Sequence, residues 1–432
     1  MSYSSNTVYY AMMVAIATIV LCTIAAFQWE FGESAYVYKH TQAKKIDLQG
    51  EKFIAYLPHS GLSNQRNELE NALLLAGYLN RTLILPPAFL GHIGGWQSND
   101  HLFEYMDTMT KPQPWWNRCK DKLGLADGPC HAKSGYASVP WEYLHSSIFE
   151  LDIPMRSIRH ISLDKIKAML TLSDDEVHIQ HDTSLYTWFL CDIPNEQCPT
   201  LDPTIFETGG RRSYDEQWNI EDLRRIEKPL IQLQGIFGTD RVGVSQKQHL
   251  ELRNKIREAL VYRNPTLEKV TDTITERLGG KQQFLSIHVR MGNRQFLGPL
   301  HKHIEEQIAF LETAQQRGPG NSTFCEPDDF QIYVATDAKD PRKSPELVPV
   351  FERFPCAKVL GDYKDLLPSL ESDDAGVTLF QPPQQSIVNF LIPVIDAMVA
   401  GHAKDFMGNP SSTYSTYIEQ LQLAYSQTNS IA

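Results

Sequence analysis

The residues best suited to chemistry are His288 and Arg290, which follow the apolar segment 284–287. In a strand, alternate side chains point to one face, so His288 and Arg290 would share a face and Val289 would point away. A guanidinium can bind a phosphate through two N–H groups, and ligands of open α/β sheets lie at the carboxyl ends of strands. The segment therefore predicts an anion-binding strand end. The alternative is a buried strand whose arginine pairs with a core carboxylate.

A second candidate is the loop at residues 60–64. It lies between a predicted strand at 53–57 and a predicted helix at 65–78, whose apolar side chains recur every three to four residues. A further strand is predicted at 83–85, which completes a βαβ unit with parallel strands. The loop would then lie at the amino end of a helix, where backbone N–H groups favour a phosphate. A plain connecting loop is the alternative.

The remaining elements must position the strand end at His288 and Arg290 and the loop at residues 60–64. The segment 91–206 has no regular pattern and is interpreted as long loops and short helices that shape a substrate groove. A strand at 228–235 would return to the first sheet. Helices are predicted at 246–261, 265–278, 386–400 and 414–423, and strands of a second sheet at 284–289, 332–335, 357–360 and 405–407. The sequence thus predicts an α/β protein with one domain at 52–245 and another at 246–426.

Composition narrows the class of protein. The 432 residues are enough for two or three domains. The formal net charge is −12 and the sequence pI is about 5.6. Nucleic-acid binders usually carry a basic surface and a high pI, so that class is excluded as the main function, whereas a local basic pocket for a nucleotide is not.

The N-terminus is a separate element. Residues 8–27 are uncharged and almost wholly apolar, long enough to span a bilayer as a helix. We expect an uncleaved signal-anchor with a cytosolic tail at 1–7 and a stem at 28–51. The alternative is a secretory signal peptide cleaved near Ala25 and Ala26. With either alternative the body of the protein would lie in the secretory lumen. With a signal-anchor the protein would be a single-pass type II membrane protein of the Golgi or endoplasmic reticulum.

Cysteine usage is consistent with that compartment. Cys22 lies in the apolar segment, and six cysteines remain, an even number that suits three disulfides. One pairing among several joins neighbours in sequence: Cys119 with Cys130, Cys191 with Cys198, and Cys325 with Cys356. Two N-glycosylation sequons begin at Asn80 and Asn321.

Four segments, in this order, resemble the GDP-fucose-dependent protein O-fucosyltransferases and their relatives in plants, fungi and bacteria. They are residues 61–86, FLSIHVR at 284–290, IYVATDA at 332–338, and Asp396 together with FMGNPSSTYS at 406–415. The resemblance implies a GT-B fold, in which two Rossmann-like domains face a cleft and the nucleotide lies mainly on the C-terminal one. It also implies catalysis without a metal or other cofactor, and the chain has no Asp-x-Asp motif.

The resemblance also implies residue roles. Arg290 would contact the β-phosphate, His288 would lie near the base and ribose, and Asp396 would accept hydrogen bonds from guanine. The rest of the GDP-fucose site would be formed by the first and last loops: Ser60, Gly61, Leu62, Ser63, Asn64, Thr413 and Tyr414. Purely structural alternatives remain: a core histidine at 288, a pairing or capping aspartate at 396, and a helix cap at Thr413.

One departure concerns the general base. Some members of the resembled family carry a glutamate in the first loop, where this chain has Ser60 and Gly61, and the next carboxylate, Glu68, falls inside the helix. The base is therefore unassigned. The predicted function is inverting transfer of fucose from GDP-fucose to a Ser or Thr hydroxyl of a lumenal protein acceptor. The alternatives are a glycan or other acceptor, or a catalytically silent GDP-sugar-binding module.

Overall fold

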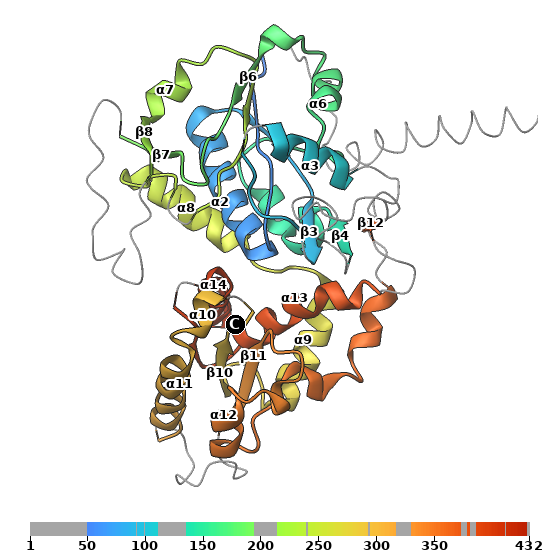
Figure 1. Ribbon diagram of the computed structural model, residues 1–432, viewed down its shortest axis with the longest axis vertical. Coiled ribbons are helices and arrows are strands. Elements are labelled where there is room, and N and C mark those ends of the chain that lie inside the picture. Colours follow the sequence, from blue (N-terminus) through green and yellow to red (C-terminus); the bar gives the residue numbers. More distant parts are fainter. Residues whose placement is uncertain are drawn as a thin grey trace, which may run out of the picture.

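The chain folds into two α/β lobes stacked along the long axis of the molecule (Figure 1). The computed structural model describes residues 50–91, 93–98, 100–110, 135–193, 214–238, 241–292, 294–316, 330–372, 378–380, 386–410 and 412–429. The predicted tail and membrane helix, and the stem up to residue 49, lie outside these ranges. Within them, no helix has both the length and the apolar character needed to cross a bilayer.

The N-terminal lobe is built on a parallel sheet in the order β5-β2-β1-β9-β6. Its strands are β1 (Phe53–Ala55), β2 (Thr82–Leu85), β5 (Met155–Ser157), β6 (Val177–Gln180) and β9 (Leu230–Leu233). The predicted βαβ unit is confirmed, with α2 (Leu62–Leu79) between β1 and β2. The central strands are runs of buried side chains, as expected for a sheet that is covered on both faces.

Besides α2, the helices of this lobe are α3 (Asp100–Thr110), α5 (Trp141–Leu144), α6 (Leu163–Leu170), α7 (Ile220–Arg224) and α8 (Lys247–Ala259). The predicted domain boundary misplaces the last of these helices. A boundary at 246 assigns α8 to the C-terminal domain, but α8 packs on α2. Arg257 Nε donates to Glu70 Oε1 at 2.8 Å, and the Tyr78 ring stacks on His249 at 3.8 Å. The crossover between lobes therefore follows α8.

The C-terminal lobe contains a parallel sheet in the order β11-β10-β13. Its strands are β10 (Phe284–Val289), β11 (Gln331–Thr336) and β13 (Asp405–Met407), and its helices are α9 (Pro265–Arg277), α10 (Arg294–Leu297), α11 (Leu300–Gln315), α12 (Val348–Arg353), α13 (Val388–Gly401) and α14 (Thr413–Asn429). In the β10–β11 register Val289 lies opposite Thr336, so both strands end at the same level.

Two sequence predictions about secondary structure are wrong. The segment 91–206 is not only loops and helices, because it supplies β5 and β6 to the main sheet, as well as β4 (Tyr136–Val139) and β7 (Trp188–Cys191). β5 and β6 are short and half-buried, so they lack a detectable alternation. The strand expected at 357–360 is reduced to one bridge between Lys358 and Tyr333, after which a 3-10 turn begins.

Other short elements complete the chain. They are the strand β8 (Glu216–Asn219), which pairs with β7, and the 3-10 helices η2 (Ser146–Glu150), η3 (Asp174–Glu176), η5 (Pro341–Lys343), η6 (Leu360–Tyr363) and η7 (Leu367–Ser372). Cys191 and Cys356 are each disulfide-bonded. The other cysteines of the predicted pairs lie outside the described residues, so the pairing stays a prediction.

The two lobes share a core. One apolar cluster runs from Leu73 on α2 through Tyr262 to Leu391 on α13 and Tyr417 on α14. A small antiparallel sheet also joins the halves of the sequence, because β12 (Thr378–Phe380) pairs with β4, which pairs with β3 (Ala88–Gly91). The lobes are therefore packed against each other rather than linked by the chain alone.

Candidate functional site

Arg290 lies at the carboxyl end of β10, as the sequence predicts. Its Nη1 donates to Asp337 Oδ2 at 2.6 Å, and its backbone N–H donates to Asn409 Oδ1 at 2.7 Å. The side chain is 32% exposed. The guanidinium is thus held at the carboxyl end of the sheet by a carboxylate, and it remains accessible to an anion from solvent.

Asp337, to which the sequence assigned no role, organises this carboxyl end of the sheet. Besides Arg290, its carboxylate accepts the backbone N–H groups of Met291 at 2.7 Å and Gly292 at 2.8 Å. A Cβ on Gly292 would lie 2.4 Å from Asp337 Oδ2, so the turn needs glycine. The signal that could have found Asp337 is the parallel pairing, since Arg290 and Asp337 each directly follow neighbouring strands.

His288 is placed on the same strand but inside the protein. It is 2% exposed, and its Nδ1 lies 2.7 Å from Ser415 Oγ, which also accepts the N–H of Asn409 at 2.8 Å. Burial lowers the pKa of His288 to about 3, and the charge of Arg290 acts in the same direction. The neutral ring packs on Tyr414 with 4.7 Å between ring centroids. Through Ser415 these contacts hold Asn409 ahead of α14, which is what the alternative of a core histidine predicts. The contact of His288 with ribose and base stays a prediction.

Asp396 lies on α13 and is 6% exposed. Its Oδ1 accepts a hydrogen bond from Tyr333 Oη at 2.5 Å. Burial raises the pKa of Asp396 to about 7, and the hydrogen bond from Tyr333 opposes this shift. Asp396 is therefore a carboxyl group whose protonation state changes near neutral pH.

The first and last loops meet across the lobes. Thr413 Oγ1 donates to Asn64 Oδ1 at 2.8 Å, although the two residues are 349 positions apart in the sequence. Asn64 lies in the first turn of α2 and Thr413 is the first residue of α14. Two residues further along α2, the Arg66 guanidinium lies 4.2 Å from the centroid of the Tyr417 ring. The structure thus brings together two predicted site residues that come from different lobes.

The other predicted residues surround this junction. The helix begins at Leu62, not at 65, so that Leu62, Ser63 and Asn64 belong to its first turn, and the exposed Gly61 is its N-cap residue. Leu62 packs against the shared core, and Ser63 is partly exposed. Tyr414 Oη donates to the Pro393 carbonyl at 2.6 Å, which ties α14 to α13. Ser60 precedes the helix and is partly exposed.

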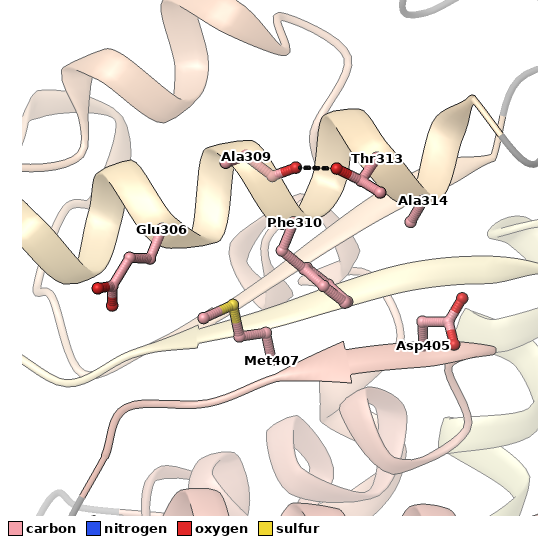
Figure 2. Close-up of a pocket in the computed structure, with 7 residues that line it drawn as sticks. All are labelled: Glu306, Ala309, Phe310, Thr313, Ala314, Asp405 and Met407. Carbon is pink, nitrogen blue, oxygen red and sulfur yellow. Dashed lines mark hydrogen bonds between the residues drawn. The ribbon is translucent and has the colours of Figure 1, made fainter.

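A separate cavity of about 380 Å³ lies between α11 and β13 (Figure 2). The side chains of Phe310 and Met407 project towards each other there. Its lining is Glu306, Ala309, Phe310, Thr313, Ala314, Asp405 and Met407. None of the predicted site residues is in that lining, so this cavity is not the predicted GDP-fucose site. Among the described residues, no group of three or more His, Cys, Asp or Glu side chains is arranged to hold a metal ion.

Comparison with known proteins bears on the resemblance. No protein-family model matches the chain. A stretch of 45 residues is 62% identical to O-fucosyltransferase 30 of Arabidopsis thaliana. The match supports a relationship to the O-fucosyltransferases. The matched stretch makes up 10% of this chain and spans 9% of the length of that relative.

Solved fucosyltransferase structures align over most of the chain at low similarity. POFUT1 in complex with GDP-fucose is 14% identical, with 88% of this chain and 95% of that chain covered and a TM-score of 0.40. The fucosyltransferase NodZ from Bradyrhizobium is 14% identical, with 85% and 93% covered and a TM-score of 0.39. The description of the fold therefore rests on the strand order and packing given above.

Proposed function

We propose that this protein is a fucosyltransferase that uses GDP-fucose and needs no metal. The observation that carries the proposal is the 45-residue match to an O-fucosyltransferase. The geometry supports it, because Arg290 is partly exposed at a strand end and Asn64 and Thr413 meet between the lobes.

The proposed transfer of fucose gives one role to the residue beside the diphosphate of GDP-fucose and another to the residue beside its guanine. When the bond between the fucose anomeric carbon and the β-phosphate oxygen breaks, negative charge builds up on GDP. A guanidinium at Arg290 would interact more strongly with that charge in the transition state than in the ground state, which lowers the barrier. The Asp396 carboxylate would accept hydrogen bonds from guanine N1–H and N2–H₂ and so favour GDP over UDP.

The acceptor and the compartment are the finer part of the proposal. Fucose would be transferred, with inversion, to a Ser or Thr hydroxyl of a protein in the secretory pathway. The apolar segment 8–27 would anchor the protein in the Golgi or endoplasmic reticulum membrane. The even number of cysteines after Cys22 supports an oxidising lumen.

Calorimetry on the full-length protein in detergent tests the proposal. The protein would be titrated with GDP, GDP-fucose, GDP-mannose and UDP in EDTA, and release of GDP from each sugar donor would be followed. We expect binding of the guanine nucleotides, no binding of UDP, and slow release of GDP from GDP-fucose. Binding without release would indicate a silent GDP-sugar-binding module, and equal binding of UDP would contradict the role of Asp396.

A further inference from the structure

Ser60 is held in an unusual backbone conformation. Its φ is +64°, a left-handed value that is strained for a residue with a Cβ and persists only where surrounding bonds impose it. Its N–H donates to the Gly94 carbonyl at 2.9 Å, and its carbonyl accepts from Gln65 Nε2 at 2.9 Å. Gln65 is itself fixed by hydrogen bonds to both backbone groups of Phe89. The backbone of the partly exposed Ser60 is therefore held in one place.

Behind Ser60 lie two buried titratable groups that the proposed donor site does not use. His59 Nδ1 is 2.9 Å from Ser60 Oγ, and His59 Nε2 is 3.0 Å from Glu68 Oε1. The other Glu68 oxygen accepts the His59 backbone N–H at 3.1 Å. The side chains of His59 and Glu68 are 1% and 0% exposed. In the described part of the chain neither Nε2 nor Oε1 has a hydrogen-bond partner of good geometry, so the two atoms form a close polar contact.

The arrangement determines where the imidazole proton lies. A carboxylate next to Nε2 favours a proton on Nε2, which leaves Nδ1 to accept from Ser60 Oγ–H. Burial raises the pKa of Glu68, and His59 opposes that shift most strongly. The buried Arg241 also favours the charged carboxylate, Tyr56 faces Glu68 too, and Asp182 lies near His59 and pairs with Arg241 at 3.8 Å. A buried polar pair of this kind often stabilises a protein no more than apolar side chains of the same volume, so stability alone gives a weak reason for it.

We propose that Ser60, His59 and Glu68 form a proton relay that activates the acceptor hydroxyl, an inference that rests on the proposed function. The acceptor hydroxyl gives its proton to Ser60 Oγ while Ser60 Oγ–H passes its own proton to His59 Nδ1. The acceptor oxygen bonds to the anomeric carbon as the bond from that carbon to the β-phosphate oxygen breaks, and the electron pair leaves on GDP. The imidazolium then returns its proton to Ser60 Oγ, which passes its own proton to water, because Ser60 is the only member of the relay that is partly exposed. Ser60 is the catalytic residue, and Glu68 positions and stabilises the imidazolium.

The position of Ser60 fits this role. It lies four residues before Asn64, which contacts Thr413 of the opposite lobe. The relay therefore supplies a base at the junction between the lobes without placing a carboxylate next to the departing diphosphate. That separation avoids a negative charge beside a leaving group that is itself becoming more negative.

Hydrolysis of GDP-fucose by the full-length protein, with and without sodium azide, tests the relay. Water must lose a proton as it attacks, whereas azide is already an anion. We expect Ser60→Ala and Glu68→Gln to slow GDP release in water, by about 100-fold for Ser60→Ala, the usual scale for loss of a general base. Azide should restore most of the rate in both variants and yield fucosyl azide. A structural defect would not be rescued in this way.

Two further variants separate the relay from folding. Ser60→Gly removes the hydroxyl and relieves the positive φ, so the protein should fold at least as well and still lose the rate in water. Glu251→Gln is the control, because Glu251 is an exposed carboxylate on α8 that pairs only with Lys247 among the described ion pairs, and its rate should equal that of the wild type.

The outcomes distinguish the two proposals. Wild-type rates in Ser60→Ala and Ser60→Gly would overturn the relay and leave the donor site intact. A loss of rate that azide does not restore, with unchanged binding of GDP-fucose, would also overturn it. Failure of the wild-type protein to release GDP from GDP-fucose would overturn the proposed fucosyltransferase activity, and the relay with it.

Discussion

The carboxyl ends of β1 and β10 occupy the same place in their two lobes but carry opposite kinds of polar group. After β10, the permanent charge of Arg290 is partly exposed and is held by Asp337. After β1, the polar groups His59 and Glu68 are buried behind the hydroxyl of Ser60. A fixed exposed charge suits the binding of an anion, whereas buried titratable groups suit the movement of a proton. The difference indicates that the lobes divide the reaction, with the leaving group on one side and the acceptor on the other.

The largest expected effect concerns the β10 side. Arg290→Ala should lower the rate of GDP release from GDP-fucose by about 100- to 1000-fold, the usual cost of removing one donor that stabilises a developing negative charge. Azide should not restore this rate, because the defect lies in the leaving group. Lys339→Ala is the control, since Lys339 is an exposed cation close to Asp337 in sequence. Equal rates in the two variants would contradict the assignment of Arg290.

Asp396 gives a smaller effect that depends on pH. Its pKa is raised to about 7, so its carboxylate becomes available to guanine only as the pH rises through about 7. Affinity for GDP relative to UDP should therefore increase over that range in the wild type and stay flat in Asp396→Asn. At pH 8 the variant should bind GDP about 10- to 100-fold more weakly, the scale for a charge-assisted hydrogen bond. Calorimetry at pH 6, 7 and 8 measures both quantities.

The same shift predicts the pH dependence of stability. A raised pKa means that the folded state binds the Asp396 proton more tightly than the unfolded chain, whose value is about 3.9. This contribution to the free energy of unfolding is full below about pH 4 and is lost as the pH rises through about 7. Urea denaturation at several pH values should show this loss in the wild type but not in Asp396→Asn. An identical profile in both proteins would contradict it.

The smallest effect tests whether the two lobes act together where the starts of α2 and α14 meet. The hydrogen bond between Thr413 and Asn64 should contribute about 1 kcal/mol. Thr413→Val, Asn64→Ala and the double variant form a thermodynamic cycle, measured by urea denaturation, in which the single effects should not add. Strict additivity would mean that the lobes do not meet at this bond in solution.

The parts of the fold that the sequence predicted well are long or strongly apolar. β10 was predicted at its observed bounds, and the βαβ unit around α2 follows from regular helical spacing. β5 and β6 were missed because their few residues are half-buried and mixed in character. Their pairing depends on the strands already in the sheet, which no local pattern reveals.

Local sequence patterns also reveal the candidate site only in part. Arg290, Asn64 and Thr413 are site residues predicted from the sequence, and the structure places each at the end of a strand or the start of a helix. The partners Asp337 and Glu68 were not identified, because pairing is set by the register of neighbouring strands and by how a helix faces the sheet. Glu68 lies one turn before Ala72, in line with the predicted apolar residues of α2, and a carboxylate at such a position is the signal that could have found it.

The small sheet β3-β4-β12 has a consequence for biosynthesis. Its third strand, Thr378–Phe380, comes from the C-terminal half of the chain, whereas β3 and β4 belong to the N-terminal half. While the ribosome is still making the second half, β4 has one edge without its final neighbour, and such edges invite pairing with other chains. A nascent chain that stalled before residue 378 would therefore be a target for chaperones, even though every residue of its N-terminal sheet had already emerged.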